Sequence, residues 1–188
     1  MVVERCDWVT DDPLYIDYHD QEWGIPKTDP DQLFEFLMLE GMQAGVSWLV
    51  VLKKRQAMRD ALAHFDPNQL AQWEEKDIEP LMANQQIIRN RAKLKAIISN
   101  ARAWLNLQNS EGDISQYLWS FVGNQVRQNS WSSYADVPGS TPESDAMAKA
   151  LKKAGFKFVG AKICYAFMQA TGMVNDHIVS CFRHQQLQ

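Results

Sequence analysis

The chain has 188 residues, of which 46% are hydrophobic, and a formal net charge of −4. This length and apolar content suit one compact unit over residues 1–188, or two closely packed lobes. It has no apolar run of about 18 residues and no apolar leader at its start, so we expect a cytoplasmic protein without a membrane partner. Its three cysteines cannot form a complete disulfide framework, which also favours a reducing compartment.

The basic residues gather in three stretches that contain no acid. Fourteen of the 19 lysines and arginines lie in residues 53–59, 89–102 and 149–162. Clusters of this kind can give an acidic protein a positive face, which would suit nucleic acid. Each stretch taken alone is better explained as a solvated helix face.

Helical patterns run along nearly the whole chain. A capping oxygen precedes a proline, as at the start of a helix, in Asp29-Pro30, Asp66-Pro67 and Thr141-Pro142. Between Arg91 and Leu107, apolar residues recur three and four apart and mark one buried helix face. Gly155 and Gly172 follow periodic segments and predict helix ends. Because no segment alternates as a strand does, we predict an all-α fold with about eight or more helices.

Two cysteines and two histidines near the chain ends form a candidate metal site. Cys6 and His19 lie near the start, while His177 and Cys181 are four residues apart and can face the same way on a helical turn. A set of two cysteines and two histidines completes a tetrahedral zinc shell and leaves no position for water, so such an ion would be structural. Asp176 adjoins His177 and is a candidate to orient its ring. The spacing equally permits two buried cysteines and two ordinary histidines.

Aromatic residues and one carboxylate are concentrated in the first 48 residues. The aromatic residues are Trp8, Tyr15, Tyr18, Trp23 and Trp48. Glu40 stands at the end of a very apolar segment, where a buried carboxylate would need a partner. Because aromatic faces attract cations, these groups together suit a flat, positively charged, nitrogen-rich ligand. The simpler alternative is that the aromatic residues are core and that Glu40 pairs locally.

Four long segments closely resemble the 3-methyladenine DNA glycosylase I family, a branch of the helix-hairpin-helix glycosylases. They are RCDWVTDDPLYIDYHDQEWG, LEGMQAGVSWLVVLKKR, STPESDAMAKALKKAGFKFVG and ICYAFMQATGMVNDHIVSC. The resemblance covers essentially the whole chain and implies a helical bundle. It also implies one structural zinc ion that joins residues 1–25 to residues 172–188 through Cys6, His19, His177 and Cys181.

The resemblance further implies a monofunctional DNA repair enzyme that acts as a monomer on double-stranded alkylated DNA. It would flip 3-methyladenine out of the duplex, hydrolyse its glycosidic bond, release the free base and leave an abasic site. Glu40 would be the catalytic residue and would hydrogen-bond the base, while Tyr18 and Trp48 stack on it. The remaining base-pocket residues would be Trp8, Tyr15 and Trp23.

Two segments are expected to contact DNA. Residues 78–102 resemble the family's backbone-binding hairpin, which implies phosphate contacts from Arg89, Arg91 and Lys93. A loop expected to reach into the duplex contains Gln43, Gly45 and Val46. Val46 stands at the wedge position, where the family tends to have leucine.

Two other functions remain open at this point. A zinc-stabilised helical module could bind DNA or modified bases without catalysis. A metallohydrolase would use the zinc ion directly, although four protein ligands leave that ion no open coordination position.

Overall fold

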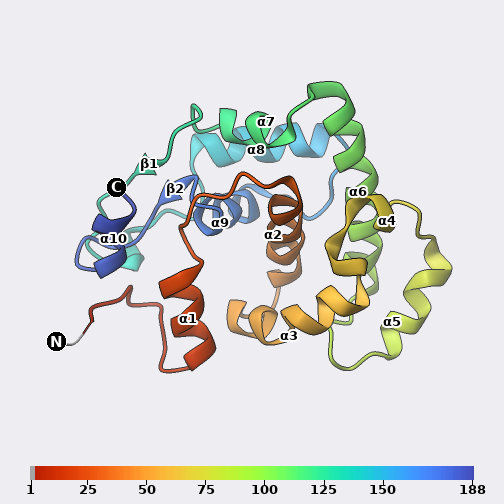
Figure 1. Ribbon diagram of the computed structural model, residues 1–188, viewed down its shortest axis with the longest axis horizontal. Helices are drawn as coiled ribbons and strands as arrows, with labels where there is room; N and C mark the ends of the chain where they lie inside the picture. The colour runs from red at the N-terminus through yellow and green to blue at the C-terminus, as the bar shows by residue number, and fades with distance from the viewer. Residues whose placement is uncertain (1–2) are drawn as a thin grey trace.

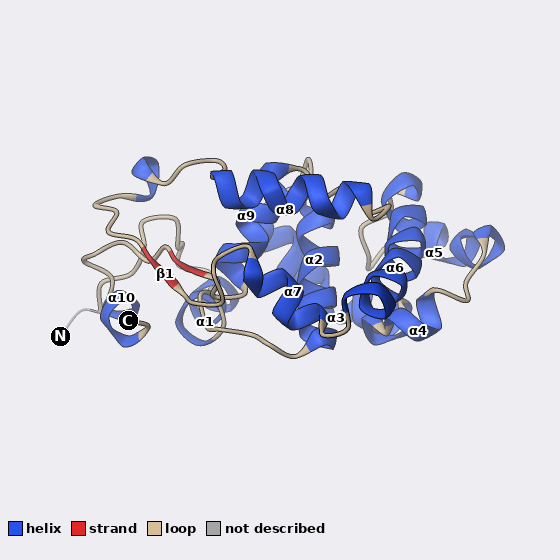
Figure 2. Ribbon diagram, turned by 90° about the horizontal axis from the view of Figure 1, so that it is seen from above, coloured by secondary structure: helices blue, strands red, loops and turns tan. Residues whose placement is uncertain are grey.

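The computed structural model describes residues 3–188 as helices joined by short loops (Figures 1 and 2). Within these residues there are ten α-helices: α1 (Pro13–Gln21), α2 (Pro30–Gln43), α3 (Trp48–Ala61), α4 (Pro67–Leu70), α5 (Glu79–Ala83), α6 (Arg91–Glu111), α7 (Ile114–Ser120), α8 (Pro142–Lys153), α9 (Ala161–Ala170) and α10 (Phe182–Gln186). Short 3-10 turns are η1 (Ala63–Phe65), η2 (Glu75–Ile78) and η3 (Tyr134–Asp136). The predicted all-α class is confirmed.

One short parallel strand pair was not predicted. β1 (Arg127–Gln128) pairs with β2 (Val174–Asn175), so that Arg127 lies opposite Val174. Each strand has only two residues, which is too short for an alternating pattern to be visible in the sequence.

Helix α2 is the centre of the molecule, and α3, α6, α7 and α9 pack around it (Figure 1). All its residues from 33 to 42 are buried. A helix that is apolar around its whole circumference is buried on every side. The burial of α2 also buries the carboxylates of Glu35 and Glu40. Arg55 and Arg59 neutralise Glu35, with nitrogen–oxygen distances of 2.8 Å. Glu40 has no such cation within residues 3–188.

The predicted helix boundaries are confirmed by their capping contacts. The carboxylate of Asp29 accepts hydrogen bonds from the second and third backbone amides of α2, at 2.9 and 3.0 Å. Thr141 caps α8 in the same way, and Asp66 caps α4. Gly155 and Gly172 follow α8 and α9 with φ of +98° and +71°, the left-handed conformation that ends a helix.

The first and last segments of the chain lie at the same end of the molecule in both views (Figures 1 and 2). The backbone amide of Phe182 donates to the carbonyl of Glu4 at 3.0 Å. Asp7 accepts a hydrogen bond of 2.8 Å from the Ser133 hydroxyl, so the loop around η3 joins the same assembly. No helix within residues 3–188 is long and apolar enough to cross a membrane.

Gly172 lies where the chain is tightest. A Cβ atom there would stand 2.4 Å from the backbone nitrogen of Pro26 and 2.5 Å from the carbonyl carbon of Ile25. We expect Gly172→Ala to lower the free energy of unfolding by about 2–5 kcal/mol, because it combines a left-handed conformation with a backbone clash.

Gly123→Ala is the matched control, since its φ is +73° but nothing lies within 4 Å of the added atom. It should cost only about 1–2 kcal/mol, from backbone strain alone. Urea unfolding of the three proteins measures both values, and equal losses in the two variants would contradict the proposed clash.

Candidate active site and metal centre

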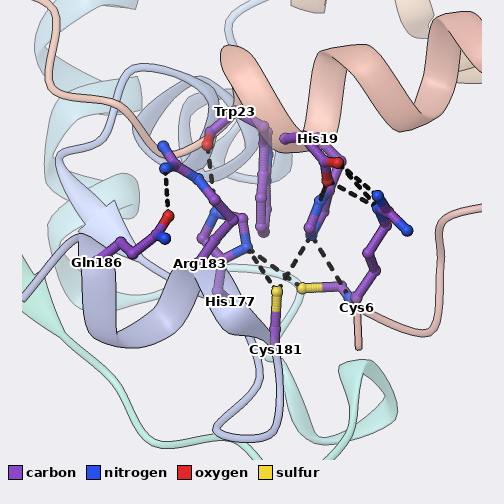
Figure 3. A network of polar contacts seen from close by, with 9 residues as sticks. Cys6, His19, Trp23, His177, Cys181, Arg183 and Gln186 are labelled. Carbon is purple, nitrogen blue, oxygen red and sulfur yellow. Dashed lines mark hydrogen bonds and ion pairs between the residues drawn. The ribbon is translucent and has the colours of Figure 1, made fainter. Parts of the chain in front are cut away.

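Four buried side chains from the two ends of the chain meet in one cluster (Figure 3). They are Cys6, His19, His177 and Cys181, and their ligand atoms all lie within 4.8 Å of one another. The Cys181 Sγ atom is 3.4 Å from His19 Nε2 and 3.5 Å from His177 Nδ1. Tetrahedral ligands of a zinc ion stand about 3.3–3.8 Å apart, so the donor set and its spacing fit a metal ion.

Both histidine rings are held by their second nitrogen. His19 Nδ1 lies 2.8 Å from the Asp20 carboxylate, which Arg5 binds in turn through two of its nitrogens. His177 Nε2 lies 3.2 Å from the carbonyl oxygen of Trp23. These contacts fix which ring nitrogen faces the cluster, as is usual for metal-binding histidines. Hydrogen bonds from Cys6 and from the two rings lower the pKa of the Cys181 thiol, which favours the thiolate that binds metals.

Asp176 does not orient His177, so this expectation was wrong. Its carboxylate is 1% exposed. The four donors that surround it are the side-chain nitrogens of Asn129, Trp131 and Gln169 and the hydroxyl of Tyr165, at 2.6–2.8 Å. The Asp176 carboxylate therefore holds these four side chains together, and the carbonyl of Trp23 is the group that orients His177.

A cavity of about 320 Å³ opens beside the metal cluster. All six residues predicted for the base pocket line it: Trp8, Tyr15, Tyr18, Trp23, Glu40 and Trp48. The rings of Tyr18 and Trp48 have centroids 5.6 Å apart, and those of Trp8 and Tyr15 are 4.9 Å apart. The sequence therefore identified six of the side chains that line this cavity.

Three of the cavity-lining side chains have a buried polar atom that finds no hydrogen-bond partner in residues 3–188. They are one oxygen of Glu40 and the indole nitrogens of Trp8 and Trp48. Burial raises the pKa of Glu40 to about 8, because no nearby cation offsets the loss of water around its charge. Buried polar groups almost always have partners, so one acceptor and two donors left free at one cavity indicate a site for a polar ligand.

The cavity and the metal cluster share a wall. The Trp8 ring lies 5.3 Å from His19, and the Trp23 ring lies 4.6 Å from His177, measured between centroids. Trp8 and Trp23 also contact one another edge to face, at 5.1 Å. Residues of the four-residue cluster therefore also contact two aromatic walls of the cavity.

Four further lining residues were missed: Ser47, Tyr134, Ala166 and Gln169. Gln169 is a buried polar residue in the part of α9 that follows Lys162, where the other residues are apolar or aromatic, and that contrast was visible in the sequence. Tyr134 comes from η3 and is positioned by its backbone amide, which donates to Asp7. Nothing in the sequence linked this loop to the cavity.

The end of α2 and the loop that joins it to α3 border the cavity. Gln43 lines the cavity, Gly45 has a φ of +84°, and Val46 is 37% exposed. Lys93 does not match its predicted role as a phosphate contact. Its side chain is 6% exposed and its ammonium group donates to the backbone carbonyls of Met42 and Ala44. Lys93 therefore holds this loop from inside the protein.

Ion pairs neutralise most of the positive charges in the first two basic stretches. In the first stretch, Lys53 pairs with Asp12, and Arg55 and Arg59 pair with Glu35. In the second stretch, Arg91 pairs with Glu79, Lys95 pairs with Glu75, and Arg102 donates to two carbonyls. Arg89 is exposed and makes no ion pair within residues 3–188.

The third stretch is different, because its charges are free. It comprises the exposed residues Lys149, Lys152, Lys153, Lys157 and Lys162. None of the ion pairs within residues 3–188 involves them. They lie on α8, on α9 and on the turn at 154–160 that joins these two packed helices. The most open positive surface is thus this α8–α9 hairpin, and not residues 78–102.

Comparisons with known proteins identify the family to which the chain belongs. A family model described as methyladenine glycosylase matches residues 8–184. DNA-3-methyladenine glycosylase 1 of Escherichia coli K12 is 52% identical and is aligned over 95% of this chain and 96% of its own. A crystal structure of 3-methyladenine DNA glycosylase I superposes with a TM-score of 0.93 at 56% identity, over 95% of this chain and 98% of that one.

A Staphylococcus aureus structure, described as the structural basis of 3-methyladenine recognition by 3-methyladenine DNA glycosylase I, has a TM-score of 0.92 at 35% identity. It covers 95% of both chains. The match with the family model and the identity to these relatives both extend over nearly the full length. The chain therefore belongs to the methyladenine glycosylase family.

Proposed function

We propose that the protein hydrolyses the glycosidic bond of 3-methyladenine in alkylated DNA, releases the free base and leaves an abasic site. The observation that carries this proposal is the unpaired carboxylate oxygen of Glu40 in a cavity walled by Tyr18 and Trp48. A base inside a duplex is not accessible to such a buried group, so the nucleotide has to leave the stack and enter the cavity.

The cavity favours a methylated base through its charge. Methylation at N3 makes the nucleoside cationic, which weakens its glycosidic bond and distinguishes it from neutral adenine. Aromatic faces attract that cation, and its arrival supplies the positive partner that Glu40 lacks. A carboxylate whose pKa is raised by burial becomes ionised once a cation is bound, so Glu40 can accept hydrogen bonds from the amine edge of the base.

The lining residues also limit the chemistry. Glu40 is the one carboxylate among the cavity-lining side chains of residues 3–188, and no lysine lies among them. Glu40 is therefore the group available to stabilise the positive charge that develops as the bond breaks, and water completes the hydrolysis. Without a lining amine to form a Schiff base, we expect base release without strand cleavage.

Release of 3-methyladenine from methylated duplex DNA, followed by chromatography, tests this function. Glu40→Gln should slow single-turnover release by at least about tenfold, because a hydrogen bond to a charged group is lost. Glu111→Gln is the matched control, since Glu111 is exposed at the end of α6, and its rate should be unchanged. A wild-type protein that binds the base and the DNA but releases nothing would instead identify a binding module.

We infer that the ion at the four-residue cluster is zinc and that it is structural. Two thiolates and two imidazoles at tetrahedral spacing are ligands that zinc prefers, and four protein ligands leave no position for water. The ion would supply a link between the chain ends. In this way it would hold Trp8 and Trp23 in place without taking part in the reaction.

Metal analysis should find one zinc ion per chain, and Cys181→Ser should lose it. The melting temperature of this variant should fall markedly, because metal binding is coupled to folding, while the activity per folded molecule should change less. Cys164→Ser is the control, since Cys164 is buried in α9 away from the cluster and should retain zinc. A Cys181→Ser variant that is stable and folded but inactive would indicate a catalytic ion.

DNA would be bound through its backbone by the α8–α9 hairpin. Five exposed lysines lie there. The N-cap of α9 is Gly160, which has no side chain to cap the helix, so the first amides of α9 are free to meet a phosphate. Helix α9 forms one half of this hairpin and also contributes Gln169 to the cavity lining, so the proposed DNA-binding surface and the base site share one helix. Arg89, Gln43, Gly45 and Val46 remain proposed DNA contacts. We further propose a cytoplasmic monomer.

The salt dependence of duplex binding separates surface lysines from Lys93. Replacing both Lys153 and Lys157 with alanine should reduce the slope of log Kd against log salt by about 2, roughly one unit for each phosphate contact. Lys93→Met should leave the slope unchanged while it slows release, because Lys93 contacts backbone carbonyls and not solvent. A reduced slope in Lys93→Met would restore its predicted role as a phosphate contact.

A further inference from the structure

Gln169 is a buried amide at the cavity whose orientation the protein dictates. It lies on α9, is 5% exposed and lines the cavity. Its side-chain nitrogen Nε2 donates to the Oδ2 atom of Asp176 at 2.7 Å. Asp176 in turn receives Tyr165 at the same oxygen and Asn129 and Trp131 at the other.

The surroundings of Asp176 allow only one orientation of this amide. A carboxylate that four donors surround is an acceptor at every contact, so it has to meet the NH₂ group of Gln169 and not its oxygen. Turning the amide over would place two oxygens against each other and would leave a buried acceptor unpaired. The carbonyl oxygen Oε1 is therefore the end of Gln169 that Asp176 leaves free.

This oxygen is available to a ligand. Within residues 3–188 it makes no hydrogen bond of normal geometry, although Nε2 of the same amide does. The hydroxyl of Tyr134 lies beside Gln169, and this contact acts to lower the pKa of Tyr134, which is the effect of an amide N–H that donates to the phenol oxygen. It therefore involves the NH₂ group and leaves Oε1 free. Helices α2 and α9 pack side by side, so Glu40 and Gln169 present two acceptors to one cavity.

We propose that Gln169 is a specificity-determining residue, whose Oε1 atom accepts one N–H of the exocyclic amine of 3-methyladenine while Glu40 accepts from the same edge of the base. The proposal rests on the proposed function of this cavity. An exocyclic amine has two N–H donors, and two acceptors match them. Asp176 acts as a positioning residue, since it contacts Gln169 and not the base.

The proposal separates two kinds of selection. The aromatic walls and the charge of Glu40 respond to methylation, which makes the base cationic in the nucleoside. Gln169 responds to the group at the six-position of the purine. A carbonyl oxygen there, as in 3-methylguanine, would face acceptors and leave buried groups unpaired, so the site should favour adenine over guanine.

A ligand-by-variant comparison tests this. Calorimetry measures the binding of free 3-methyladenine and of 3-methylpurine, which lacks the amine, to the wild-type protein and to Gln169→Met. In the wild type, 3-methylpurine should bind at least about tenfold more weakly, since one hydrogen bond is worth about that factor. In Gln169→Met the ratio of the dissociation constants of the two ligands should be smaller by about fivefold or more, because the variant has already lost one acceptor. Gln116→Met, exposed on α7, should behave as the wild type does.

Equal losses of affinity for both ligands in Gln169→Met would overturn the proposal, because the residue would then only shape the cavity. If this variant does not fold, the wild type still decides the matter by NMR. The side-chain carbonyl carbon of Gln169 should shift on binding 3-methyladenine and not on binding 3-methylpurine, and equal shifts would contradict the proposal. A wild type that binds neither base and releases none from DNA would refute the proposed function itself.

Discussion

The loss of water around the Glu40 carboxylate is the constraint on which the site depends. Helix α2 is apolar on all sides, so its position at the centre of the bundle carries Glu40 into the interior. Glu35, five residues earlier, is neutralised by two arginines, whereas Glu40 has an oxygen without a partner among the described residues. An unpaired buried carboxylate costs stability, which the apolar contacts of the same helix offset. The protein thus keeps a site that a cationic ligand completes.

The walls around this carboxylate come from segments that are far apart in the chain. Trp8 lies before α1, Trp48 begins α3, and Gln169 lies near the end of α9. The four-residue cluster contacts Trp8 and Trp23 directly, so it sets the position of one wall. Lys93 sets the position of the loop at the cavity mouth in a comparable way, through the carbonyls of Met42 and Ala44. Recognition therefore depends on contacts that never touch the ligand.

Much of the fold could be predicted from local patterns. Caps such as Asp29 and stops such as Gly172 act on their own helix, so neighbouring residues suffice to identify them. The four cluster residues and the six aromatic and acidic pocket residues were also identified, because their side-chain chemistry is distinctive and a family resemblance supported it.

The remaining features depend on tertiary surroundings that the sequence does not reveal. In the sequence, Lys93 resembles an exposed lysine, whereas in the structure it is buried against the end of α2. Asp176 stands next to His177 in sequence, yet its side chain faces four donors on the other side. Tyr134 reaches the cavity from the loop around η3. The lysines in residues 149–162 differ from the other basic stretches only in lacking ion pairs, which the sequence does not show.

The span of the cluster has a consequence for the order of folding. Cys6 and His177 are 171 positions apart, whereas α3, η1 and α4 contact close neighbours in sequence. Closing a long chain segment costs more entropy than closing a short one, so local helical contacts form readily and this distant contact forms late. The wall formed by Trp8 and Trp23 is thus completed after the helical interior. Partial opening at the joined ends would then abolish base recognition while most of the interior stays folded.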